Sequence, residues 1–265
     1  MSIQQRGSSE IISESRFVLS QLFFILKLPF LIVLVLLKQR RPEELLQPLH
    51  DFRVFFFGPR LTVALIAINF VVFISQAFMS EDLFLSLVFT PSDLASLNLL
   101  PLIASVFMHA NLAHLLGNML FLFIFGRIIE ITFGAFRMVM IYFGSGLIAF
   151  IISGLAGQGG IGASGAIAGL IAAAILIRPF YLTYLIMGIP LPIILVGWLA
   201  ILSDVSGILY QRDDGIGYYA HMGGYLAISL LVFILNKEDR DKMKIGLAIN
   251  TVFVIAYLIA VTFFI

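Results

Sequence analysis

The chain has 265 residues, of which 61% are hydrophobic and only 12% are charged. Soluble domains are about 45–50% apolar and about 25% charged, so this composition excludes an ordinary soluble protein and indicates a helical membrane protein. The formal net charge of +1 provides no basic surface for nucleic acid, and the absence of cysteine excludes disulfides, thiolate nucleophiles and Cys-ligated metals.

The chain begins with a polar stretch, residues 1–16, that does not resemble a cleavable signal peptide. Lys27 and Pro29 lie near the middle of the first apolar run, which leaves two interpretations open: a kinked span or a helix at the membrane interface. The later apolar runs have the length and composition of membrane segments. The predicted helices are residues 17–37, 61–79, 112–127, 136–156, 164–178, 182–203, 218–236 and 246–265.

Lys and Arg are distributed unequally over the loops between these helices. The loops that would share one side of the membrane hold twelve Lys and Arg residues, whereas the opposite loops hold one, Arg212. Cytoplasmic loops are enriched in Lys and Arg, so the first set is assigned to the cytoplasm. The long loop 80–111 then lies outside. Its apolar stretches, interrupted by Pro91 and Pro101, predict short helices that dip into the outer leaflet.

A serine begins the predicted helix 164–178, directly after the glycine-rich stretch 157–162. Glycines allow a tight backbone turn and the close approach of another segment. The free N–H groups and the positive dipole end of a helix N-terminus favour an anion such as a tetrahedral oxyanion. Ser164 is therefore a candidate nucleophile, although this pattern taken alone favours a simple N-cap.

His221 is the candidate partner of this serine. It shares a stripe of helix 218–236 with Gly224, and Ser164 shares a stripe of its own helix with Ala168. Small residues at this spacing let helices approach closely in lipid, which would bring the hydroxyl within reach of the imidazole. Polar side chains at membrane depth are costly and usually functional. A Ser–His pair for nucleophilic catalysis is therefore favoured over a merely structural interhelical hydrogen bond.

A third polar group lies in the predicted helix 112–127. His114 and Asn118 are four residues apart and share a helix face, where their N–H groups are candidate oxyanion donors. The alternative is a zinc site made of His109, His114 and His221. It is disfavoured because the first two are five residues apart with no carboxylate between them. We therefore expect no metal and no cofactor, and we expect His109 to tie the outer loop to the helix start.

Two acidic residues lie near these motifs. Glu130 has Arg127 and Arg137 as neighbours and is interpreted as a structural ion pair or cap rather than an acid catalyst. Asp204 follows the predicted helix 182–203 and is interpreted as a cap or loop tether rather than the acid of a triad. A Ser–His dyad needs no aspartate if packing orients the imidazole.

The order of these motifs resembles that of the rhomboid family of intramembrane serine proteases. The motifs are His109-x4-His114-x3-Asn118 on an early helix, Gly-Ala-Ser-Gly at 162–165 two helices later, and Ala-His-x-x-Gly at 220–224 two helices after that. The glycine and glutamate at positions 126 and 130 match as well.

The resemblance covers residues 61–236 and implies an all-α polytopic membrane protein with a rhomboid-like six-helix protease core. Two additions would flank this core. Residues 1–60 would be an N-terminal hydrophobic segment and a basic cytoplasmic linker, and residues 237–265 a basic loop and an extra C-terminal transmembrane helix.

The resemblance also implies a division of roles. Ser164 would attack the scissile carbonyl, and His221 would act first as general base and then as general acid. Asn118, His114 and the backbone N–H of Ser164 would line the oxyanion hole, under a cap formed by the loop 204–217. The substrates would be single-span membrane proteins in the lipid bilayer, with helix-destabilising residues near a small P1 residue.

Four further residues would support this site: His109, Gly162, Gly165 and Gly224. The resemblance and the charge distribution together lead us to expect a multi-pass protein of a prokaryotic cell membrane. Its active site would open to the extracytoplasmic side.

The sequence departs from the family pattern at Ala168, where some members carry an aromatic residue that stacks on the catalytic histidine. The orientation of His221 is then expected from Tyr218, Tyr219 or Phe180. Two alternative functions belong to other classes. A catalytically silent relative that binds membrane clients is disfavoured because both Ser and His are present. A transporter or channel is disfavoured because the central helices hold almost no charged residue.

Overall fold

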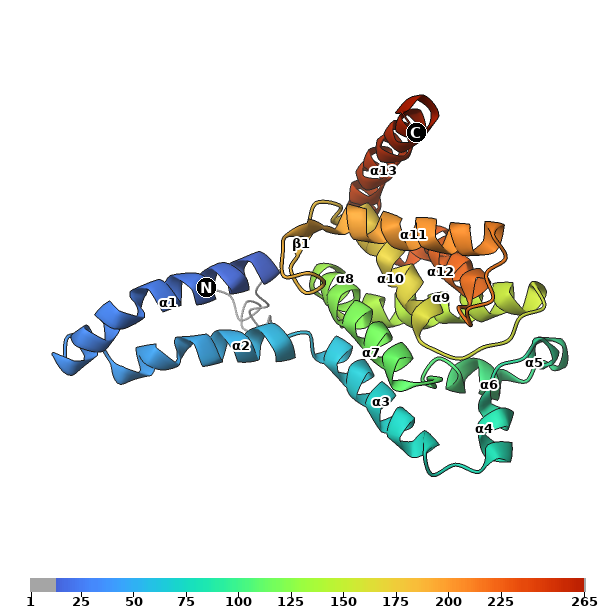
Figure 1. The fold of residues 1–265 in the computed structure, drawn as a ribbon, viewed down its shortest axis with the longest axis horizontal. Coiled ribbons are helices and arrows are strands. Elements are labelled where there is room, and N and C mark those ends of the chain that lie inside the picture. The colour runs from blue at the N-terminus through green and yellow to red at the C-terminus, as the bar shows by residue number, and fades with distance from the viewer. Residues whose placement is uncertain (1–12, 265) are drawn as a thin grey trace.

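The computed structural model describes residues 13–264, apart from the side chains of residues 258 and 260–264. Helix α10 (Ser164–Ile177) lies at the centre, where every residue from Gly165 to Ile175 is buried. It packs against α9 (Ala135–Leu155) and α12 (Tyr218–Leu231), and these two also pack against each other (Figure 1). Since α10 consists of glycine, alanine and aliphatic residues after its first serine, its neighbours can approach closely.

Several helices have the length and composition of membrane spans. The helix α7 (Leu112–Phe121), the π-helical turn η3 (Leu122–Gly126) and α8 (Arg127–Phe133) form one rod. This rod, α9 and α1 (Glu14–Leu36) are each long and apolar enough to cross a membrane. Three shorter apolar helices follow: α10, α11 (Ile193–Leu209) and the segment Tyr218–Ile234, in which the turn η4 (Val232–Ile234) continues α12. The prediction of an all-α polytopic membrane protein is confirmed.

The predicted helix 182–203 is wrong at its start and its end. Residues Leu182–Thr183 (β1) and Leu191–Pro192 (β2) pair as a short antiparallel ribbon, and α11 begins only at Ile193. Proline fixes φ and lacks an N–H, so Pro190 and Pro192 oppose helix formation, and the intervening Gly188 turns with a φ of +71°. At the other end α11 continues to Leu209, which places Asp204 inside a helix rather than in a loop.

The outer loop is folded into three short helices, as predicted for residues 80–111. They are α4 (Glu81–Leu87), α5 (Pro91–Ser96) and α6 (Leu99–Ala104). Ser80 accepts a hydrogen bond from the N–H of Leu83 at the start of α4, and Thr90 with Asp93 forms a capping box at the start of α5. The side chain of Thr90 lowers the pKa of the Asp93 carboxyl by hydrogen bonding to it.

Glu130 acts as a cap for another helix, which is one of the two structural roles predicted for it. The rod 112–133 extends beyond the predicted end at 127, so Glu130 lies on α8. Its carboxylate accepts hydrogen bonds from the N–H of Leu61 (3.0 Å) and from the N–H and hydroxyl of Thr62 (2.8 and 2.7 Å). These donors open α3 (Arg60–Gln76), where a helix has no acceptors of its own.

The segment before α3 forms a hairpin with α1. It contains η2 (Pro42–Leu46) and α2 (Gln47–Phe57), and it meets α3 at a bend of 71°. Figure 1 shows α1 and α2 side by side, extending away from the bundle. The helix expected at 17–37 is thus present, and both interpretations of its relation to the bilayer stay open.

Several contacts attach this hairpin to the bundle, and two of them involve charged side chains. The carboxylate of Glu14, at the start of α1, accepts hydrogen bonds from the hydroxyl of Thr183 (3.0 Å) and from the N–H of Tyr184 (2.8 Å). The guanidinium of Arg127 on α8 lies over the ring of Phe55 on α2, with Cζ 4.0 Å from the ring centroid. The first contact joins the start of α1 to the ribbon β1–β2, beside which α1 begins in Figure 1.

The last helix, α13 (Lys237–Phe264), leaves the bundle after packing against the end of α10. A Cβ at Gly246 would overlap the carbonyl of Leu176, so the two backbones touch there. Asn250 donates to the carbonyl of Ile175 (2.8 Å) and accepts from the indole N–H of Trp198 (2.7 Å). Figure 1 shows the remainder of α13 projecting away from the core.

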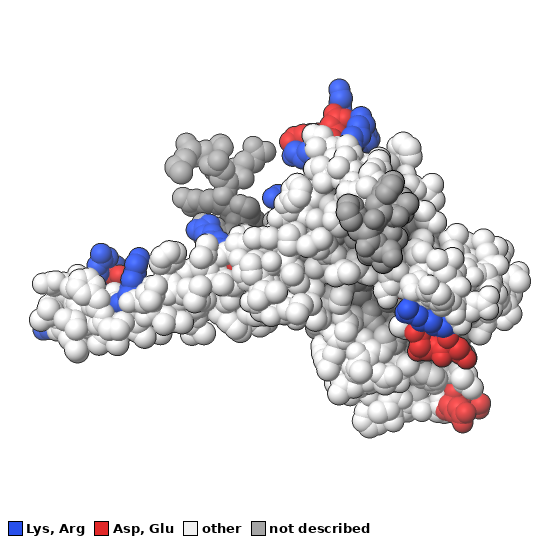
Figure 2. All heavy atoms as spheres, turned by 45° about the horizontal axis from the view of Figure 1, so that its top comes forward, with Lys and Arg blue, Asp and Glu red and all other residues white. Residues whose placement is uncertain are grey.

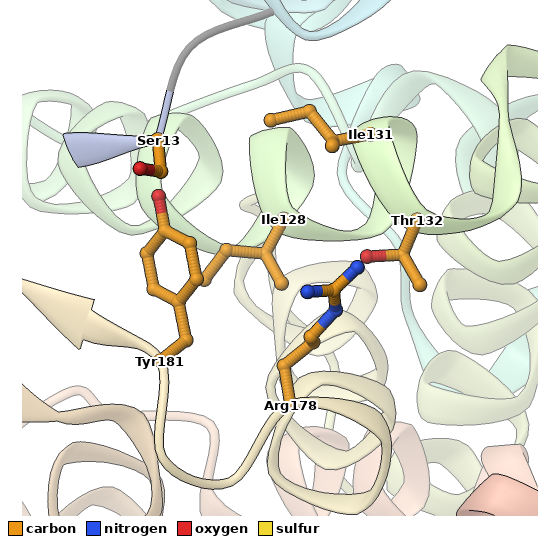
Figure 3. A pocket seen from close by; sticks show the side chains of 6 residues that line it. All are labelled: Ser13, Ile128, Ile131, Thr132, Arg178 and Tyr181. Carbon is orange, nitrogen blue, oxygen red and sulfur yellow. The ribbon is translucent and has the colours of Figure 1, made fainter. Parts of the chain in front are cut away.

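A small cavity lies where the start of α1 meets α8 and the turn after α10 (Figure 3). Its volume is about 90 Å³, and the Arg178 guanidinium and the Tyr181 hydroxyl point into it. Arg178 follows the last residue of α10, whereas Ser164 is the first. The cavity therefore lies at the opposite end of α10 from the candidate nucleophile.

Charged side chains gather in a few places on the visible face of the molecule. Figure 2 shows Lys and Arg along the N-terminal hairpin and at the base of α13, with some Asp and Glu among them, and mainly Asp and Glu at the lower right with one cluster of basic atoms beside them. This distribution agrees with the unequal loop charges of the sequence. The orientation inferred from those charges stays a prediction.

Replacing Glu130 by alanine is expected to destabilise the fold. Two N–H groups at the start of α3 would lose their acceptor, and a buried donor without a partner costs about 1–3 kcal/mol. We expect a lower apparent Tm in detergent, followed by circular dichroism. Glu238→Ala, at a residue exposed on α13, is the control and should leave Tm unchanged. Equal Tm values for wild type and Glu130→Ala would contradict the capping role.

Candidate active site

Ser164 is held at the end of a turn that the outer loop fixes in place. The N–H of Gly160 donates to the carbonyl of Phe89 (2.9 Å), and the N–H of Gly162 donates to the carbonyl of Ser105 (2.7 Å). The backbone at Gly162 has a φ of +125°, which a residue with a side chain rarely adopts. The chain then enters α10 at Ser164, whose side chain is only partly buried.

The backbones of α10 and α12 touch beside Ser164 and His221. A Cβ at Gly224 would overlap the carbonyl oxygen of Gly165, and a Cβ at Gly165 would lie 3.4 Å from the carbonyl oxygen of Ala220. Since Gly165 follows Ser164 and Ala220 precedes His221, this contact brings the two candidate residues to the same place in the bundle. Ser164 and His221 thus lie where the small-residue stripes meet.

His114 and Asn118 face the same turn from α7. A Cβ at Gly162 would lie 2.8 Å from the Cε1 and Nε2 atoms of His114 and 3.8 Å from the amide nitrogen of Asn118. Asn118 is buried, and its amide donates to the carbonyl of His114 at 3.0 Å. The two side chains therefore meet the backbone two residues before Ser164, and a glycine at 162 leaves the room for them.

His109 is fully buried behind His114, with their ring centroids 5.0 Å apart. The side chain of Gln76, at the end of α3, hydrogen-bonds to both the N–H and the carbonyl of His109 (3.0 and 2.9 Å). This places His109 as a link between the end of the outer loop and α3. Among the described residues, no three His, Asp or Glu side chains form a group that could hold a metal ion, so the alternative zinc site gains no support.

The hydrogen bonds of His221 correct the interpretation of Asp204. The Nδ1 atom of His221 lies 2.9 Å from Oδ1 of Asp204, and Oδ2 of the same carboxylate accepts the hydroxyl of Tyr225 at 2.7 Å. Asp204 is buried and is neither a cap nor a loop tether. The prediction failed because α11 extends past residue 203, which turns the Asp204 side chain toward α12.

The aromatic residues expected to orient His221 lie elsewhere or have other partners. Tyr218 donates its hydroxyl to Asp214 (2.6 Å), and this hydrogen bond lowers the pKa of the Asp214 carboxyl in the loop after α11. Phe180 is 67% exposed, and Tyr219 is exposed as well. Sequence reasoning missed Tyr225, although its position four residues after His221 on one helix was an available signal.

Replacing Gly224 by alanine is expected to push α12 away from α10. The added methyl group would overlap a backbone carbonyl, and overpacking of this kind costs about 1–3 kcal/mol. The apparent Tm in detergent should fall. Gly217→Ala is the matched control, because a Cβ there would meet only the Cβ of Ala220 at an ordinary 3.6 Å. A Gly224→Ala variant with wild-type Tm would contradict the close helix contact.

A protein-family model described as the Rhomboid domain matches residues 96–238, more than half of the chain. The chloroplastic Rhomboid-like protein 11 of Arabidopsis thaliana is 30% identical over 151 residues, which cover 53% of this chain and 54% of that protein. The mitochondrial RHOMBOID-like protein 12 of the same plant is 29% identical over 170 residues, covering 57% and 49%.

A third relative, the mitochondrial RHOMBOID-like protein 6 of Arabidopsis thaliana, is 35% identical over 153 residues, covering 53% of this chain and 45% of that protein. The chain thus spans about half the length of the curated relatives it matches. The matched range 96–238 contains α7, the turn before Ser164, and α12. The sequence motifs, the helical bundle and the family match agree, and the chain belongs to the rhomboid family.

Proposed function

We propose that the chain is an intramembrane serine endopeptidase that cleaves transmembrane segments with Ser164 and His221. The observation that supports this proposal is the backbone contact between α10 and α12, in which the residue after Ser164 lies against the carbonyl of the residue before His221. A serine next to a histidine, at a helix N-terminus, is the minimum equipment for nucleophilic acyl transfer.

The proposed reaction has two halves. In the first, the Oγ of Ser164 attacks the scissile carbonyl carbon while Nε2 of His221 takes the hydroxyl proton. The tetrahedral intermediate collapses, His221 gives that proton to the leaving amine, and an ester to Ser164 remains. In the second, His221 takes a proton from water as the water oxygen attacks the ester carbonyl. The second tetrahedral intermediate then collapses, His221 returns the proton to Oγ of Ser164, and the product leaves as a carboxylic acid that ionises in water.

The negative oxygen of each tetrahedral intermediate would be stabilised by three donors. The backbone N–H of Ser164 belongs to the first turn of α10, where N–H groups have no acceptor within the helix. His114 and Asn118 lie against the turn at Gly162 and supply side-chain donors from α7. Donors that are already in position stabilise the oxyanion most strongly in a site that excludes bulk water.

The substrates of such a site are single-span membrane proteins. Ser164 and His221 are partly buried at the ends of apolar helices, so a segment must come from the bilayer and present an unwound peptide bond. From the distribution of loop charges we propose that the site opens to the extracytoplasmic side. A prokaryotic cell membrane stays a prediction, and the relatives described above are named as chloroplastic and mitochondrial proteins.

The proposal is tested by incubating the purified protein in detergent with a transmembrane substrate of low helix stability. The wild type should cleave it, Ser164→Ala should abolish cleavage while keeping the wild-type Tm, and His221→Ala should abolish cleavage as well. Ser229→Ala and His50→Ala, at exposed positions, are the matched controls and should cleave normally. An intact substrate with the wild type, under conditions in which a control protease cuts it, would favour the silent client-binding relative.

The oxyanion donors allow a second prediction. Asn118→Ala should lower kcat by about 10²–10³-fold with little change in KM, because loss of one such donor is felt mainly in the transition state. Asn98→Ala, at an exposed position before α6, is the control and should retain wild-type kcat. A wild-type kcat for Asn118→Ala would show that Asn118 is not a donor in the oxyanion hole.

A further inference from the structure

Asp204 is a carboxylate inside an apolar helix, and both of its oxygens are engaged by α12. Oδ1 lies 2.9 Å from Nδ1 of His221, and Oδ2 accepts the hydroxyl of Tyr225 at 2.7 Å. The side chain of Asp204 is only 9% exposed, and that of His221 is 16% exposed. A buried carboxylate is expensive unless hydrogen bonds satisfy it, so this arrangement calls for a specific reason.

The hydrogen bond to Asp204 decides which nitrogen of His221 carries the proton. A carboxylate only accepts, so Nδ1 must be the donor and the neutral imidazole must be the Nδ1–H tautomer. Nε2 is then left with a free lone pair, as required of a base that takes the proton of a serine. The hydroxyl of Tyr225 holds the carboxylate from the other side and fixes the plane in which it meets the imidazole.

The packing around Ala168 explains why His221 needs a hydrogen bond to orient its ring. A Cβ at Gly224 would lie 2.8 Å from the Cβ of Ala168, so this alanine sits at the closest approach of α10 and α12. An aromatic side chain at position 168 would force the helices apart. Stacking from that position is thus unavailable to orient His221, and α11 supplies a hydrogen bond instead.

We propose that Asp204 is the positioning residue of His221, held in place by Tyr225, and that it fixes the imidazole in the tautomer a general base requires. This inference rests on the proposed protease function. Asp204 touches neither substrate nor nucleophile and acts through the imidazole alone. A negative carboxylate beside the imidazole also stabilises the imidazolium formed during proton transfer.

The first test is kinetic and uses the full-length protein and the cleavage assay above. Asp204→Asn should lower kcat by about 10²–10⁴-fold with little effect on KM, because an amide can donate to Nδ1 and favour the wrong tautomer. Tyr225→Phe should cause a smaller loss of kcat. Asp82→Asn on α4 and Tyr257→Phe on α13, at exposed positions outside the site, are the matched controls and should behave as wild type.

The second test is the pH profile of kcat/KM. The groups near His221 that can titrate or carry charge are Asp204 and Tyr225, together with His114, which interacts electrostatically with it. The negative carboxylate stabilises the positively charged imidazolium, so its removal makes protonation of the His221 ring less favourable. The acid limb of the profile should therefore move to lower pH by about 1–3 units in Asp204→Asn. A variant damaged only in its packing would lose activity without that displacement.

The third test does not depend on cleavage. The chain has four histidines, so histidine-selective nitrogen-15 NMR with single substitutions can assign each ring. At a pH where the imidazole of His221 is neutral, we expect its Nδ1 to be protonated in wild type and in Ser164→Ala. An Nε2–H tautomer in wild type would overturn the inference, even if Asp204→Asn failed to fold.

The outcomes separate the two proposals. An inactive wild type with the expected tautomer would refute the protease function while leaving the hydrogen-bonded geometry in place. An active wild type whose Asp204→Asn variant keeps its kcat and its acid limb would refute the positioning role alone. Loss of kcat with an unmoved acid limb would likewise reduce Asp204 to a packing role and overturn the inference.

Discussion

The contact between α10 and α12 is the constraint on which the candidate site depends. Two backbones can touch in a bilayer only where side chains are absent or nearly so, and here Gly165, Ala168 and Gly224 meet. A single methyl group at Gly224 would collide with a carbonyl oxygen, so the contact leaves no room for a side chain at this position. Because Ser164 and His221 adjoin these small residues, their proximity follows from packing rather than from any bond between them.

The other parts of the site are fixed relative to this contact. The outer loop holds the turn before Ser164 through backbone hydrogen bonds from Gly160 and Gly162, and α7 brings His114 against the same turn. The third support is α11, which carries Asp204 to the far side of the imidazole. Polar groups from four separate segments thus meet at the start of one apolar helix. Because polar groups are costly in lipid, such convergence indicates a function.

The sequence predicted the helices that have strong apolar periodicity or small-residue stripes, whereas the catalytic roles that it assigned to Ser164 and His221 stay predictions. It also predicted that Glu130 is structural. The helices could be predicted because each depends on residues close together along the chain, whereas the groups that Glu130 caps lie 68 and 69 residues away from it. The limits of the helices were less predictable, and α8 continues the rod to Phe133, beyond the predicted end at residue 127.

Asp204 was misjudged for a physical reason that sequence reasoning could not overcome. The prediction ended the sixth helix one residue too early for Asp204 to belong to it, whereas tertiary packing extends α11 to Leu209. The predicted start of the same helix was wrong for a different reason. Pro190 and Pro192 oppose a helix there, and both are visible in the sequence. The partner of Asp204 lies 17 residues away on another helix, at a distance that only the folded structure defines.

The central claim is that Ser164 is a nucleophile activated by His221. The most direct measurement is reaction of the purified protein with a fluorophosphonate, followed by mass spectrometry of the intact chain and of its peptides. The account predicts one covalent adduct, located on Ser164 and absent in His221→Ala. It would be contradicted by an unmodified chain under conditions that label a control serine hydrolase, or by an adduct on another residue that persists in Ser164→Ala.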